Sequence, residues 1–231
     1  MKTENVLALM NQIKNEYGKN SCLSFVTVRQ LNECVEALTQ EQQKATAKAN
    51  GKSDIYAVVR NILNNAAKSS NQSLHGAWVQ DGMQYACDSY RAIQVFEPVD
   101  VPELNKGAKP LDVAKFFNNP QADIELALPD IRALKADIAQ AKANFRVKAG
   151  SSRARCHVLY RFDNGALVNA EYLYDGIRAT GATTAMTSKN AKGLLINPVY
   201  LYSDKCNYMF VPIHPGVYGA ITNTGAFAIA Y

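Results

Sequence analysis

The change of hydrophobic periodicity near Leu74 constrains the fold of this chain more than any other feature of the sequence. Before this point, apolar residues recur at the three- to four-residue spacing of amphipathic helices. After it, short runs alternate apolar and polar residues and are divided by turn residues such as Asp81-Gly82. The pattern predicts an α+β fold of repeated modules, each with a strand, a helix and several antiparallel strands.

Helix and strand signals alternate along the whole chain. The expected helices cover 3–16, 28–38, 53–63, 129–141 and 171–181. The expected strands cover 21–26, 74–80, 83–96, 124–128, 145–149, 154–162, 166–170, 182–187, 193–202, 206–213 and 217–230. The polar stretch 39–52 fits either an exposed helix extension or a linker. Prolines between 98 and 120 mark a connector, which predicts a module at 1–120 with an N-terminal helical extension and a second module at 121–231.

Composition narrows the classes of protein that fit the chain. Hydrophobic residues make up 48% and charged residues 19%, which favours a packed core over a disordered chain. The five cysteines are widely spaced, so we expect reduced thiols in a cytoplasmic protein and neither a disulfide framework nor a zinc site. No long apolar stretch occurs and the three histidines lie far apart, so we expect no membrane span, cofactor or metal.

Sequence motifs for catalysis are absent. No phosphate-binding loop, dinucleotide-binding glycine pattern or hydrolase motif occurs. Asp88 has no carboxylate or histidine close to it in sequence, so a turn-forming role fits it better than acid–base catalysis. Adjacent Cys156 and His157 would point to opposite faces of a strand, which suits a nucleophile and base poorly. We expect a non-catalytic protein, with an unrelated α+β enzyme as the alternative.

Basic residues cluster in and after the helix that follows Pro129. The chain has a net charge of +5, which permits a polyanionic partner without requiring one. Cations on one helix flank can attract DNA phosphates without reading base sequence, whereas a solvated helix face is the plainer alternative. The candidate DNA-binding residues are Arg132, Lys135, Lys142, Arg146 and Lys148, and Arg153 and Arg155 extend the cluster.

Three segments carry motifs in a fixed order. In the first, at 74–95, Asp88 and Arg91 match a Thr-Asp-Gly-x-Arg-Leu pattern that ends a strand pair, although the Thr, Gly and Leu positions differ. The second, at 123–141, is a strand, a proline and a helix. The third, at 166–215, matches a pattern Asn-x-x-Tyr-Leu-x-Asp-x-Leu followed by three strands; its matching residues are Asn169, Tyr172, Leu173, Asp175 and Ile177, with Pro212 further on. Together the segments resemble the bacterial DNA sliding clamp, the β subunit of DNA polymerase III.

The resemblance implies a shortened and divergent clamp of phage type, a processivity factor of DNA replication that holds double-stranded DNA non-specifically. Bacterial clamps have three domains and this chain has room for two, so ring closure would require a homo-oligomer. The family also binds replication proteins, which insert a hydrophobic peptide into an apolar pocket. The matching positions are Cys87, Tyr90, Arg91, Ala92, Pro129, Met209 and Val211. A monomeric clamp-fold module that binds peptides without encircling DNA is the alternative.

Overall fold

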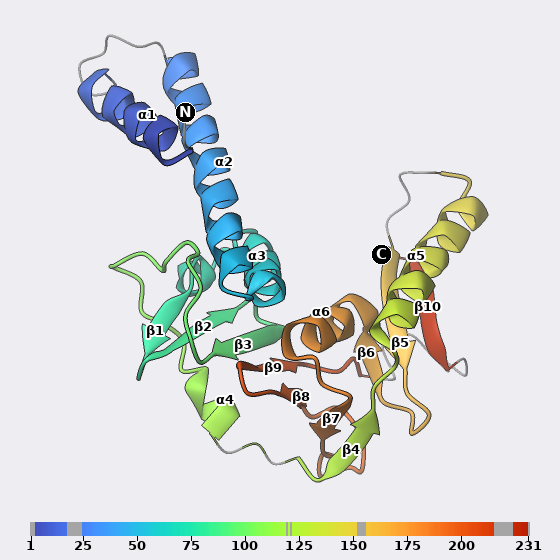
Figure 1. Cartoon of the computed structure of the whole chain (residues 1–231). Helices are drawn as coiled ribbons and strands as arrows, with labels where there is room; N and C mark the ends of the chain where they lie inside the picture. Colours follow the sequence, from blue (N-terminus) through green and yellow to red (C-terminus); the bar gives the residue numbers. More distant parts are fainter. Residues whose placement is uncertain are drawn as a thin grey trace. The chain divides into compact units, whose positions relative to one another are not determined.

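The structure is a computed structural model of the chain and describes residues 3–17, 25–118, 120, 122–151, 156–214 and 224–230. The chain divides into two compact units, Met1–Tyr56 and Ala57–Tyr231, each with its own internal contacts. The helices are α1 (Thr3–Tyr17), α2 (Phe25–Ala49), α3 (Ser53–Ala66), α4 (Ala114–Asn118), α5 (Ile131–Lys148) and α6 (Ala170–Thr180) (Figure 1). The strands are β1 (Trp78–Gln80), β2 (Met83–Cys87), β3 (Arg91–Val95), β4 (Ile124–Ala127), β5 (Cys156–Arg161), β6 (Leu167–Asn169), β7 (Thr184–Thr187), β8 (Val199–Tyr202), β9 (Cys206–Phe210) and β10 (Gly225–Ala230).

The first unit is built from α1, α2 and the start of α3, and α1 packs against α2. Apolar residues of α2 at helical spacing, such as Leu31, Val35 and Leu38, are half-buried. Charged residues occupy its other faces, where Arg29 pairs with Glu33 at 2.9 Å. Because α2 continues to Ala49, the polar stretch after residue 38 is a helix extension rather than a linker.

The second unit contains a seven-stranded sheet with the strand order β1-β2-β3-β9-β8-β7-β4. All its strand pairs are antiparallel. The β1–β2 hairpin closes through Asp81 and Gly82, which both have positive φ, as a tight two-residue hairpin turn requires. The pairing of β3 with β9 brings strands from both sides of the predicted boundary near residue 120 into one sheet. The division into modules 1–120 and 121–231 stays a prediction.

The two faces of this sheet are covered differently. On one face, a row of paired residues (Cys87, Ala92, Met209 and Tyr200) belongs to an apolar cluster with Trp78, Tyr85 and Phe117. On the other face, α6 packs against β9 and β8. Gly176 permits this approach, because a Cβ there would lie 2.7 Å from the ring of Tyr208.

A three-stranded sheet with the order β10-β5-β6 completes the second unit. Helix α5 packs against β10, β5 and α6, and its buried side is formed by Leu134, Ile138 and Ala141. Asp130 caps the helix by accepting hydrogen bonds from the backbone N–H groups of Arg132 and Ala133, both at 2.9 Å. The predicted helix after Pro129 is thus confirmed.

The α+β fold class with antiparallel sheets predicted from the sequence is confirmed, but some local predictions are wrong. Of the expected strand 193–202, only Val199–Tyr202 is a strand, β8. The stretch 145–149 is the end of α5 and its cap, not a strand, because Phe145 continues the helical spacing of the buried stripe. The connector after residue 97 contains the short helix α4, which the prolines concealed. The predicted strand at 21–26 lies outside the described residues up to Ser24, and α2 begins at Phe25. Only 224–230 of the predicted last strand is described.

Candidate functional site

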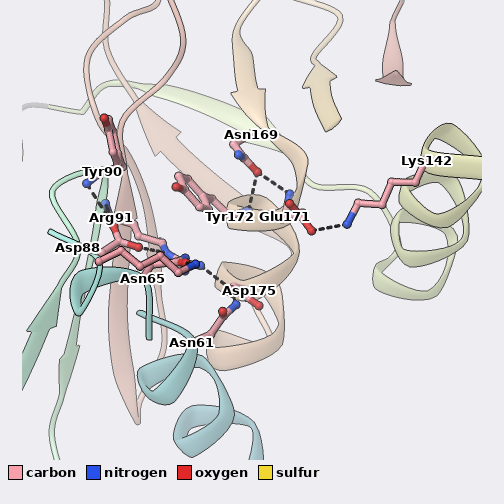
Figure 2. A network of polar contacts seen from close by, with 11 residues as sticks. Asn61, Asn65, Asp88, Tyr90, Arg91, Lys142, Asn169, Glu171, Tyr172 and Asp175 are labelled. Atoms are coloured by element: carbon pink, nitrogen blue, oxygen red, sulfur yellow. Dashed lines mark hydrogen bonds and ion pairs between the residues drawn. The ribbon is translucent and has the colours of Figure 1, made fainter. Parts of the chain in front are cut away.

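Two of the sequence motifs meet in a buried ion-pair network. Arg91 at the start of β3 donates from Nη1 to Oδ2 of Asp175 in α6 at 2.5 Å, and from Nε to Oδ2 of Asp88 at 2.8 Å (Figure 2). The Arg91 and Asp88 side chains are 1% exposed, which leaves water almost no access to the pair. Residues 84 positions apart in the chain are therefore joined by a charged contact inside the protein.

Asp88 shapes the turn between β2 and β3. Its Oδ1 accepts hydrogen bonds from the backbone N–H groups of Tyr90 and Arg91, at 3.2 and 3.1 Å. Ser89, which lies between Asp88 and Tyr90, has a φ of 78°, a left-handed conformation that this turn stabilises. The prediction of a turn-forming Asp88 is confirmed. The same carboxylate both forms the turn and holds the guanidinium.

Two further residues contact the guanidinium or its partners, and a third caps helix α6. The Arg91 guanidinium lies over the Tyr172 ring, 4.4 Å from its centroid, which is a cation–π contact. Asn61 of α3 donates to Oδ2 of Asp175 at 2.6 Å. Asn169 caps α6 by accepting from the backbone N–H of Glu171 at 2.8 Å and of Tyr172 at 3.2 Å, which fixes the start of the helix that carries Tyr172 and Asp175 (Figure 2).

Two factors determine the pKa values in the network: the burial of its side chains, and the position of the Arg91 cation between the carboxylates of Asp88 and Asp175. Burial raises the pKa of Asp175 above its ordinary value, while Arg91 and Asn61 act in the opposite direction. Burial lowers the pKa of Arg91, but the neighbouring acidic groups, among them Asp88 and Asp175, raise it above its usual range. Burial likewise raises the pKa of Tyr208, which stays a neutral phenol. Arg91 is therefore a permanent cation in this site.

The predicted pocket residues do not share one surface. Cys87, Ala92 and Met209 are buried in the apolar cluster on one face of the large sheet. Arg91 points to the other face, toward α6. Pro129 follows β4, which is separated from β9 by β8 and β7 in the sheet order, or roughly 14 Å at ordinary strand spacing.

Tyr90 and Val211 are the two predicted pocket residues that are exposed to solvent, whereas Pro129 is half-buried. The two are 62% and 40% exposed, among the most exposed large apolar side chains of the described residues. The backbone N–H of Val211 donates to the carbonyl oxygen of Tyr90 at 2.8 Å, so the two residues are neighbours. They form a small apolar surface beside the buried network. Half-buried Tyr172 lies nearby; burial is the main cause of its raised pKa, and Asp88 and Tyr90 add smaller increases.

The basic residues of α5 occupy more than one flank. At 100° per residue, Arg132, Lys135, Lys142 and Arg146 fall within one sector of the helix, whereas Lys148 falls on the opposite side of the buried stripe. Lys142 is half-buried and pairs with Glu171 at 2.6 Å, which neutralises its charge locally (Figure 2). Arg132, Lys135 and Arg146 are exposed. Arg153 and Arg155 lie outside the described residues.

Within the described ranges, no group of three or more His, Cys, Asp or Glu side chains is placed to hold a metal ion. In the same part of the chain, no helix combines the length and the apolar character that crossing a membrane requires. In the buried network, the carboxylates of Asp88 and Asp175 are both paired with Arg91.

Comparison with known proteins gives structural matches only. No family model and no curated protein matches the sequence. Among solved structures, the chain is similar to a putative DNA polymerase III beta subunit from Eubacterium rectale, with 10% identity and a TM-score of 0.42 over 68% of this chain and 63% of that chain. It is also similar to the beta subunit from the DNA polymerase of Streptococcus pyogenes, with 11% identity and a TM-score of 0.41 over 68% of this chain and 64% of that chain.

A third similar structure is the Helicobacter pylori beta clamp bound to a DNA ligase peptide, with 13% identity and a TM-score of 0.39 over 69% of this chain and 63% of that chain. The chain spans less than two thirds of the length of each of these clamps. They belong to the family that the three sequence segments resemble.

Sequence reasoning missed how the network is assembled. Tyr172 and Asp175 belonged to a matched motif, but neither was assigned to the site, since nothing in the sequence indicates that α6 faces Arg91. Asn61 carries no sequence signal, because a polar residue on the outer side of a helix is ordinary. The available signal was the spacing of Asp88 and Arg91. It is typical of a turn in which the Asp side chain accepts hydrogen bonds from backbone N–H groups two or three residues later.

Proposed function

We propose that the chain is a non-catalytic, clamp-like scaffold that recruits replication proteins through a hydrophobic peptide and associates non-specifically with duplex DNA. The observation that carries the proposal is the meeting of two matched motifs. Asp88 and Arg91 from the first, and Tyr172 and Asp175 from the third, make direct contacts with one another. Residues that match one family pattern and also contact each other across the fold support a shared role.

The peptide site we propose is the apolar surface of Tyr90 and Val211, bordered by Tyr172. Tyr90 offers a rigid ring with a polar tip, which suits an interface that is part apolar and part wet. The buried network beneath holds the turn that carries Tyr90 and the helix that carries Tyr172 in fixed positions, which lowers the entropy cost of binding. The buried residues Cys87, Ala92 and Met209 support this surface from the sheet.

The peptide arm of the proposal is tested with a fluorescent peptide that carries Leu and Phe anchors. Replacement of Tyr90 with Ser should weaken binding by about tenfold or more in fluorescence anisotropy, as expected for the loss of an interface aromatic. Tyr202→Ser is the matched control, since Tyr202 is 38% exposed and lies on β8 rather than at the proposed site. Equal affinities for the parent and the Tyr90→Ser variant would refute this arm.

The DNA arm rests on the exposed cations of α5. Each phosphate contact contributes roughly 0.9 to the slope of log binding constant against log salt for duplex DNA. The double variant Lys135→Glu, Arg146→Glu should therefore lower this slope by about two. The double variant Lys189→Glu, Lys192→Glu makes the same charge change at exposed lysines elsewhere and should bind as the parent does. A parent that is not retained on DNA at low salt would refute this arm.

A peptide-binding module without DNA encirclement is the second candidate, and the basic residues supply an observation in its favour. Lys142 already has a carboxylate partner and Lys148 faces away from the other four, which leaves a smaller cationic surface than five residues suggest. This candidate predicts peptide binding that depends on Tyr90, together with no salt-sensitive retention on DNA.

A further inference from the structure

The last strand of the second unit leaves one edge of a sheet without a partner strand. In the three-stranded sheet, β10 pairs on one side with β5 over six residues, and no described strand pairs with its other side (Figure 1). Alternate backbone N–H and C=O groups along a strand point to this open side and can bond another strand.

The sequence of β10 lacks the charged residues and prolines that often protect such an edge. Its residues, Gly-Ala-Phe-Ala-Ile-Ala, include no charge and no proline. The other sheet edges have backbone hydrogen-bond partners or a charge. Ala77, next to β1, forms backbone hydrogen bonds with residues 102 and 104, and the carbonyl oxygen of Leu167 in β6 accepts from the backbone N–H of Ile213. The edge of β4 carries the exposed charge of Glu125.

Two apolar side chains of β10 are incompletely covered by the chain itself. Phe227 and Ile229 are half-buried and, two residues apart, lie on the same side of the strand. They line an open hollow between β10 and α5, whose helix side includes Phe145 and Lys148. An added strand would therefore gain apolar contacts as well as backbone hydrogen bonds.

We propose that β10 pairs with β10 of a second copy of this chain, antiparallel and about a two-fold axis at Ala228. Because the axis is perpendicular to the sheet, directly opposite residues lie on the same face. In this register Phe227 of each copy lies opposite Ile229 of the other, which gives two Phe–Ile pairs. Aromatic and β-branched residues are a favourable cross-strand pair. At the axis Ala228 meets its own copy, and the pairing places no charge of β10 against another.

The size of the contact predicts how strong the dimer is. Five paired residues from each strand and the two Phe–Ile pairs bury on the order of 1,000 Å², the low end for a specific interface. We therefore expect a weak, reversible dimer that forms as concentration rises. The pairing uses the same patch of both copies, so it closes at two chains.

Charge exchange at the axis tests the proposal. The parent chain should approach twice 25.3 kDa in sedimentation or light scattering as its concentration increases. Ala228→Lys and Ala228→Glu should each dimerise about tenfold or more weakly than the parent, because like charges face each other across the axis. An equal mixture of the two should recover the dimer. A monomeric parent, or a mixture no better than either variant alone, would overturn the proposal.

A cross-link checks the register without relying on charge. Ala228→Cys places the two thiols on directly opposite residues, whose Cα separation of about 4.5–5.5 Å is within disulfide range. Ala226→Cys is the control, because the two positions 226 lie four residues apart along the pairing, about 14 Å. A disulfide-linked dimer from the first variant and not from the second, above the parent's background, is expected. Equal cross-linking of both would exclude this register.

Discussion

Replacement of Arg91 with Met tests the buried network directly. The substitution keeps an unbranched, flexible stem but shortens the side chain and removes the cation that lies between Asp88, Asp175 and the ring of Tyr172. Removal of one partner from a buried ion pair costs about 3–5 kcal/mol, because the remaining charge stays desolvated. Asp88 keeps its two backbone N–H bonds, so most of the loss comes from Asp175. That is a large share of the ~5–15 kcal/mol that stabilises an ordinary domain.

The pH dependence of this variant has a defined sign. Without the guanidinium, burial acts on Asp175 with less opposition, and its pKa rises further above the ordinary value. A carboxyl whose pKa is raised in the folded protein stabilises it most below the unfolded pKa and loses that stability as pH rises through the folded pKa. The deficit of Arg91→Met relative to the parent should therefore shrink as pH is lowered from about 7 toward about 4.

The assay is urea unfolding followed by the fluorescence of the single tryptophan, Trp78, which is buried in the second unit. Lys142→Met is the matched control: it also removes a cation from an ion pair with a carboxylate, but that pair is partly exposed and should cost under about 1 kcal/mol. Arg91→Met with Asp175→Leu should recover part of the loss. If Arg91→Met costs no more than Lys142→Met, the buried network does not stabilise the fold.

Two further predictions concern packing and thiol exposure. Gly76→Ala should destabilise the protein by about 1–3 kcal/mol in thermal or urea unfolding, because its Cβ would collide with the backbone of Glu103 and Leu104. Gly107→Ala, with nothing within 4 Å of its Cβ, should change stability little, and equal losses would contradict the close approach. Among the four described cysteines, exposed Cys34 should react first with iodoacetamide, and Cys87 and Cys206 last. Burial raises the pKa of Cys206 to about 11, which leaves roughly one thiolate in a thousand at about pH 8; fast labelling of Cys206 in mass spectrometry would refute its burial.

Most secondary-structure elements were predictable from the sequence, because their causes are local. The Asp81-Gly82 turn, the cap before α5 and the spacing of Leu134 and Ile138 each act within a few residues. The errors arose where local signals compete. The stretch after Ala141 carries apolar residues that fit a strand, but Phe145 continues the stripe of an existing helix, and adding one more turn to a helix costs little.

The candidate site could be predicted only in part. Asp88 and Arg91 were identified as a motif, and the turn-forming role of Asp88 followed from its type and position. The grouping of Arg91 with Cys87, Ala92 and Met209 could not hold in three dimensions, since pairing across β2, β3 and β9 sends the last three to the opposite face.

The sequence by itself determined that this chain forms α+β modules with antiparallel strands, because periodicity, turns and caps are local properties. Only the tertiary structure decided that Arg91 lies between Asp88 and Asp175, that Tyr90 and Val211 meet at the surface, and that β10 has an open edge among the described strands. Each of these depends on the pairing partner of a strand or on the face that a helix covers. Such choices are fixed by contacts between segments distant in the chain, which no local pattern records.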